Sequence, residues 1–181
     1  MPLPQLASFQ IAWIVQQVSE YISDLRKMYR DRAAPLSDAQ ATAMRPFFPN
    51  SALTARVLVL KRERIGNPPF YSQLGQFGFG AEDLPNFARM AAITLVDTVV
   101  SHEPFSDRLL FHELVHVVQY EKFGLEGFAQ KYVKGFLNGG SYEAIPLEKN
   151  AYELDGRFAS RRQDVFSVEA EVQAWNKAGL F

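Results

Sequence analysis

The chain of 181 residues has a formal net charge of −1, is 48% hydrophobic and 22% charged, and contains no cysteine. This length and composition predict one globular domain and argue against global disorder, and the absence of a long basic run gives no indication of nucleic-acid binding. Without cysteine, disulfides and thiolate metal ligands are excluded, so any metal must be held by nitrogen and oxygen.

The N-terminal part of the chain, residues 1–50, is expected to be helical. Large apolar side chains recur at three-to-five-residue steps over residues 5–32 and predict one amphipathic helix. Its apolar stretch 9–15 is interrupted by glutamine and has no basic residue before it, which fits neither a signal peptide nor a membrane span. We therefore expect a cytoplasmic protein. A second, short helix is predicted with Ser37 as its N-cap, ending before Pro46.

Residues 51–163 are expected to form the core of the domain. Residues 55–61 and 91–100, the latter rich in β-branched side chains, each predict a strand. Glycine, proline and aromatic residues alternate over 65–81, which predicts a loop or a bent hairpin, and residues 84–90 predict a turn or a short helix.

An apolar helix is predicted next. Ser106 and Asp107 supply N-cap chemistry just before a run of leucine, valine and phenylalanine, and Gly124 is a C-terminal stop. Pro146 suits the first turn of a later helix. The helices predicted after Gly124 are 125–137, 146–159 and 165–177. The last of these helices lies in the C-terminal segment 164–181, which is expected to cover the core of the domain.

The apolar helix contains the sequence HELVH. Residues four apart lie on one helical face, so His112 and His116 can both direct a ring nitrogen at one point about 2 Å away, as zinc requires. Glu113 is rotated by about 100° from His112 and can hold a metal-bound water, which makes it the expected general base. Two histidines and a glutamate in a buried helix are costly unless a metal partners them. We therefore predict a Zn²⁺ site in residues 51–163.

A strand followed by this helix resembles the arrangement in zincin metallopeptidases, and HELVHVVQ resembles the helix of compact predicted-peptidase families. The resemblance, over residues 90–160, is to small gluzincin-type zincins. It implies an α+β, mostly helical fold with a small sheet packed on the HExxH helix. It also implies a peptide or protein substrate, which pairs in extended form with a strand at the edge of the sheet.

The third metal ligand is expected to be a carboxylate, because a catalytic zinc has three protein ligands and His102 precedes the helix instead of following it. Glu148 followed by Ala151 resembles the E-x-x-A signature of gluzincins, in which the glutamate binds the metal and the small residue lets two helices pack closely. The predicted metal ligands are therefore His112, His116 and Glu148. The alternatives for the third position are Glu143, Glu153 and His102.

Other polar side chains are expected around the metal. Tyr152 and Asp155 share the helical face of Glu148, so either can orient His112 or His116 through its second ring nitrogen. A peptide-cleaving site also needs a donor for the oxyanion. The candidates for that donor are Tyr142, Tyr152 and His102.

These features predict a single zincin-like domain, residues 1–181, that acts as a zinc-dependent metallopeptidase. Zinc lowers the pKa of its bound water to about 7, and Glu113 takes the proton. The alternative is a non-catalytic zincin-fold protein with a binding or structural role. Glu113 argues for catalysis, because a structural site needs the two histidines but not that glutamate.

Overall fold

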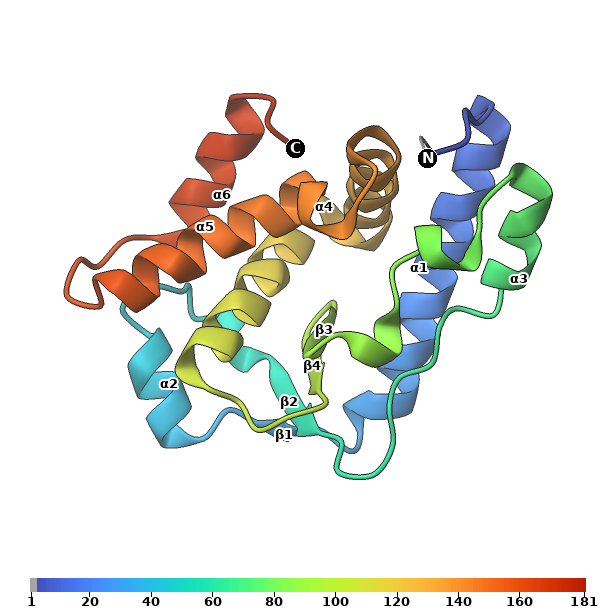
Figure 1. Ribbon diagram of the computed structural model, residues 1–181. Coiled ribbons are helices and arrows are strands. Elements are labelled where there is room, and N and C mark those ends of the chain that lie inside the picture. Colours follow the sequence, from blue (N-terminus) through green and yellow to red (C-terminus); the bar gives the residue numbers. More distant parts are fainter. Residues whose placement is uncertain (1–2) are drawn as a thin grey trace.

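The computed structural model describes residues 3–181; Met1 and Pro2, which the sequence assigns to the N-terminal helical part, lie outside the described residues. The fold is α+β and mostly helical, with one small mixed sheet, as predicted. Helix α4 (Asp107–Gly139) crosses the middle of the molecule and packs against both α1 (Ser8–Arg30) and α5 (Pro146–Ser160) (Figure 1).

The two N-terminal helices form where their patterns predict them. Helix α1 is a little shorter at both ends than the predicted 5–32. Helix α2 (Asp38–Met44) is capped by Ser37, whose hydroxyl accepts a hydrogen bond from the backbone N–H of Gln40. The buried residues of α1 are Ile14, Val15, Ile22, Leu25 and Tyr29.

The sheet has four strands in the order β1-β2-β4-β3. Strand β2 (Arg56–Val59) pairs antiparallel with β1 (Ala34–Pro35) and parallel with β4 (Thr98–Ser101). Strand β3 (Ala92–Leu95) pairs only with β4 and lies at the edge of the sheet. The predicted strand 55–61 is confirmed by β2, and β3 is the edge strand nearest to α4.

The single strand predicted over 91–100 is wrong, because the chain folds there into a hairpin of β3 and β4. The two residues of its turn are Val96 and Asp97, and Val96 has φ 63°, which β-branched residues rarely adopt. The usual glycine or asparagine is absent, so the sequence gives no turn signal. Instead the Asp97 carboxylate accepts hydrogen bonds of 2.7 and 2.8 Å from Arg26 and pairs with Arg30, which holds the turn against α1.

The sequence predicts a loop or a bent hairpin for the segment 65–81, and the structure has no strand there. The segment is a loop with the short helix α3 (Tyr71–Leu74) followed by a 3₁₀ turn, Gly75–Phe77. The predicted turn at 84–90 contains the 3₁₀ turn Phe87–Arg89. Buried aromatic side chains explain the outcome: they pack in the core beside α1, so the loop folds over that helix.

Helix α4 begins at the predicted N-cap, and at Gly124, where the sequence predicts a C-terminal stop, it bends and continues. The Ser106 hydroxyl accepts a hydrogen bond from the N–H of Leu109 at the N-terminus. Gly124, with φ 68° and ψ 173°, interrupts the helix, so that two helical arms meet at a bend. The first arm is buried from Leu110 to Tyr120, which allows it to carry polar groups into the core.

The C-terminal helices cover α4. Pro146 occupies the first turn of α5, as predicted, and a Cβ added to Gly135 of α4 would come within 2.6 Å of that proline ring. This close approach sets the position of α5 on α4. Helix α6 (Val168–Lys177) packs on both helices, in agreement with the predicted covering role. Within residues 3–181 no helix has the length and apolar character needed to cross a membrane.

Candidate metal centre

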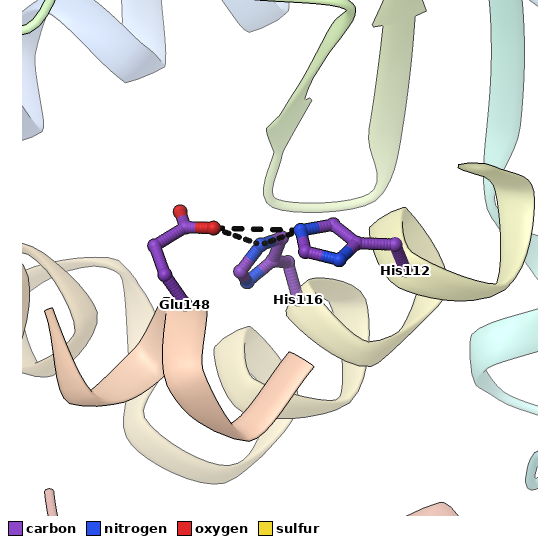
Figure 2. Close-up of side chains that lie close together, drawn as sticks. All are labelled: His112, His116 and Glu148. Carbon is purple, nitrogen blue, oxygen red and sulfur yellow. Dashed lines mark hydrogen bonds and ion pairs between the residues drawn. The ribbon is translucent and has the colours of Figure 1, made fainter. Parts of the chain in front are cut away.

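Three buried side chains meet where α5 crosses the first arm of α4. His112 and His116 lie one turn apart on α4, and Glu148 extends toward them from the first turns of α5 (Figure 2). The two Nε2 atoms are 3.3 Å apart, and each is 3.4 Å from Oε2 of Glu148. These are the residues that the sequence predicts as metal ligands.

The spacing of these three atoms fits a metal ion. Atoms bound about 2.0–2.1 Å from one tetrahedral ion lie roughly 3.3–3.4 Å apart, which matches the three observed separations. Oε2 of Glu148 is buried and makes no hydrogen bond within residues 3–181. A buried carboxylate oxygen without a hydrogen bond is costly, and a cation at the centre of the triangle would remove that cost. The group can therefore hold a metal ion.

The electrostatics of the group also favour a cation. Burial by itself lowers the pKa of His112, but the hydrogen bond to Asp155 and the nearby Glu148 carboxylate outweigh it and raise this pKa to about 10. Burial likewise opposes the charged form of His116, yet the charge of Glu148 raises its pKa. The pKa of Glu148, which burial would raise, is lowered by the two histidines. The buried carboxylates therefore favour positive charge beside them, either on the histidines or on a bound cation.

Asp155 orients the first histidine. Its Oδ2 accepts a hydrogen bond of 2.8 Å from Nδ1 of His112, which leaves Nε2 directed at the triangle. Arg108 in turn donates to Oδ1 of Asp155 at 2.8 Å. Of the two candidates on the Glu148 face, Asp155 thus makes the contact, whereas Tyr152 is half exposed and lies with its ring 4.6 Å from the His112 ring.

Gln119 orients the second histidine, and the sequence analysis missed it. Its Oε1 accepts a hydrogen bond of 2.8 Å from Nδ1 of His116. Its Nε2 donates at 3.0 Å to the Leu147 carbonyl and to Oδ1 of Asn150, so it joins α4 to the part of α5 that carries Glu148. The available signal was a glutamine three residues after His116 in an otherwise apolar run.

Glu113 is buried beside the triangle but is not one of its corners. Oε2 of Glu113 accepts a hydrogen bond of 2.7 Å from the hydroxyl of Thr94 on the edge strand β3. The same hydroxyl lies 3.1 Å from the Glu113 carbonyl oxygen. Thr94 was also missed, because only the packing of β3 on α4 brings the two residues together.

The other candidates for the third ligand lie away from the triangle. Glu143 and Glu153 are exposed. His102 uses both ring nitrogens on the backbone: Nδ1 donates to the Met90 carbonyl at 2.7 Å, and Nε2 accepts from the N–H of Ile65 at 3.0 Å. His102 is therefore wrong both as a metal ligand and as an oxyanion donor, and it holds the loop around Ile65 against the hairpin instead.

An open groove of about 560 Å³ leads from the surface to the triangle. His112 and Glu113 lie on its wall together with the two remaining candidates for an oxyanion donor, Tyr142 and Tyr152. Burial, followed by the charge of Glu148, raises the pKa of both tyrosines, so each hydroxyl keeps its proton at neutral pH. The groove thus offers a base, two hydroxyl donors and a possible metal site to one bound molecule.

No protein-family model, curated protein or solved structure matches this chain. The resemblance to gluzincins thus depends on the short motifs within residues 90–160. Functional inference has to come from the geometry of the site itself.

Proposed function

We propose that this protein is a zinc-dependent metallopeptidase that hydrolyses peptide bonds in an extended substrate. The observation that carries the proposal is the buried triangle of His112 Nε2, His116 Nε2 and Glu148 Oε2, with sides of 3.3 and 3.4 Å. Two imidazoles and one carboxylate suit zinc, and a three-ligand site leaves a fourth position for water or substrate.

Each residue of the site has a defined task in this reaction. Bound zinc would lower the pKa of water to about 7 and polarise the substrate carbonyl. Glu113, held by Thr94, accepts the proton of the attacking water and delivers it to the leaving nitrogen. Tyr142 or Tyr152 donates a hydrogen bond to the oxyanion as it forms.

The groove favours a catalytic role over a purely structural one. Structural zinc sites are closed by four protein ligands and need no neighbouring base. Here three ligands are brought together, Glu113 lies beside them, and His112 and Glu113 border an open groove. These features support catalysis over the non-catalytic alternative.

The edge strand supports an extended peptide as the substrate. Strand β3 pairs with β4 on one side only, and Ala92 lies in the groove with Glu113. Strand edges can bind extended peptides through backbone hydrogen bonds, with alternate side chains directed to the protein. All four residues of β3 are buried, and of these Ala92 borders the groove, so a peptide would pair at the Ala92 end of the strand, next to Glu113.

The test is the metal content of the purified, zinc-reconstituted protein together with cleavage of casein. We expect Glu113→Gln to retain zinc and to lose cleavage by about 100-fold or more, because only the base is removed. Glu148→Ala should lose both zinc and cleavage. Glu153→Ala, an exposed change on the same helix, is the matched control and should retain both.

Two results would contradict the proposal in different ways. If the reconstituted wild-type protein holds no zinc, the metal site is wrong. If it holds zinc and cleaves nothing, and Glu113→Gln behaves as the wild type toward every peptide tested, the non-catalytic alternative is correct.

A further inference from the structure

A second, smaller cavity borders the candidate metal centre. Glu113, His116 and Glu148 line part of its wall. Most of the wall is apolar, and its apolar side chains include Val18 and Ile22 of α1, Ile93 of β3 and Phe128 from the second arm of α4. The cavity therefore places apolar surface next to the residues of the proposed reaction.

The cavity opens off the groove next to the general base. Met90, Ala92, Glu113 and Tyr142 border both spaces. A peptide that lies in the groove with a carbonyl at Glu113 therefore has a neighbouring side chain at the entrance of the cavity. Because most of the cavity wall is apolar, a hydrophobic side chain would be favoured there over a charged one.

The size of the cavity selects among hydrophobic side chains. Its volume is about 60 Å³. One water needs roughly 10–15 Å³ of such space, so the cavity has room for roughly four to six water-sized groups. Leucine, isoleucine and methionine side chains have four non-hydrogen atoms, whereas phenylalanine has seven. The cavity volume therefore matches an aliphatic side chain of leucine size better than an aromatic ring.

We propose that this cavity is the specificity pocket of the enzyme, and that it binds an aliphatic side chain of leucine size next to the peptide bond that is cleaved. The inference rests on the proposed function, because the groove and Glu113 define where the peptide lies. Its specificity-determining residues are Val18, Ile22 and Phe128, two of which come from the N-terminal helix α1, outside the segment that carries the metal-binding motif.

The experiment measures binding of small hydroxamates to the zinc-loaded protein by calorimetry, so it does not depend on cleavage. The probes are acetohydroxamate, 4-methylpentanohydroxamate and 3-phenylpropanohydroxamate, which share one zinc-binding group. We expect the 4-methylpentano probe to bind about tenfold or more tightly than acetohydroxamate, because it buries four further carbons. The phenyl probe should bind less tightly than the 4-methylpentano probe.

Two variants change the pocket in opposite directions. Val18→Phe fills the pocket. It should bring the dissociation constants of acetohydroxamate and 4-methylpentanohydroxamate close to each other, so that their ratio approaches one. Ile22→Ala enlarges the pocket and should reverse the order of the phenyl and 4-methylpentano probes. Ile11→Phe also places a phenylalanine on α1, but Ile11 borders a different surface depression, so this control should keep the wild-type ratio.

The outcomes separate this inference from the proposed function. If zinc and acetohydroxamate bind but the longer aliphatic probe shows no gain, or if neither pocket variant changes the ratios, the specificity pocket is wrong and the metal site stands. If the protein binds neither zinc nor acetohydroxamate, the proposed function is wrong, and this inference with it.

Discussion

One hydroxyl group determines where the carboxylate of Glu113 points. Thr94 donates a 2.7 Å hydrogen bond to Oε2 of Glu113 from the edge strand, so the strand that would bind the peptide also positions the proposed base. A base displaced by about 1 Å can lose 100-fold in rate, so this contact matters more for the reaction than for stability.

We predict that Thr94→Val lowers kcat between about 10- and 100-fold, because valine keeps the shape of threonine but has no hydroxyl. The zinc content should not change, because Thr94 contacts none of the ligands' coordinating atoms. Thr94→Ser restores the donor and should recover most of the rate. The measurement is kcat with a casein-derived peptide, and equal rates for the valine and serine variants would contradict the positioning role.

The two helices that carry the ligands are joined by Gln119. Fully buried, it bonds to His116 on its own helix and to Leu147 and Asn150 on α5, so it holds Glu148 opposite the histidines. Groups that support metal ligands in this way typically contribute 10- to 100-fold to metal affinity.

We predict that Gln119→Leu weakens zinc binding about 10- to 100-fold while the helix content stays the same. Leucine has a similar volume, so the loss would come from the hydrogen bonds. The zinc dissociation constant is measured by competition with a chelator. Gln130→Leu, an exposed change on the same helix, should leave this constant unchanged, and an equal loss in both variants would argue against the bridge.

The hairpin turn depends on a charged contact with α1. Arg26 and Arg30 outweigh the effect of burial and lower the pKa of Asp97 to about 2, from an ordinary value of 3.8. A carboxylate whose pKa is lower in the folded state stabilises the fold above its ordinary pKa, and this contribution is lost as the pH falls toward the folded pKa. The stabilisation should therefore be complete above about pH 4 and disappear toward pH 2.

We predict that Asp97→Asn lowers the free energy of unfolding at pH 7 by about 1 kcal/mol. The pKa shift alone corresponds to about 2 kcal/mol, but the Asp97 side chain is 33% exposed and solvent screens the pair. Urea unfolding at pH 7, 4 and 2 measures the difference between the two proteins. A difference that is as large at pH 2 as at pH 7 would show that the ion pair is not its cause.

The candidate metal centre lies where the main helices meet, because α4 and α5 both contribute its residues and α1 packs on α4. Zinc that binds only the folded state would add about 4 kcal/mol of stability at a concentration 1,000 times its dissociation constant. In a protein of this size one kcal/mol shifts Tm by about 2–4 °C.

We therefore predict that zinc raises Tm by about 10 °C and that a chelator reverses the change. Glu148→Ala should remove most of this rise, whereas Glu153→Ala should retain it. Calorimetry with and without zinc provides the measurement. An equal rise in both variants would mean that zinc binds elsewhere or that Glu148 is not a ligand.

Several parts of this protein could be predicted from the sequence because they depend on local geometry. The helical repeat places His112 and His116 on one face whatever surrounds them, and the caps at Ser37 and Ser106 and the bend at Gly124 act within one helix turn. The short signature around Glu148 indicated the carboxylate that the structure brings to the two histidines.

Tertiary structure decided the rest, because the remaining contacts join residues that are distant in the chain. Thr94 reaches Glu113 only when the edge strand packs on α4, and Gln119 reaches Asn150 only when α5 crosses that helix. The turn at Val96 has no local signal, since its partner Arg26 lies 71 residues from Asp97. Composition and helical periodicity thus determined the main helices and the pair of histidines, whereas the hairpin, the supports, the groove and the pocket arise from the packing of separate elements.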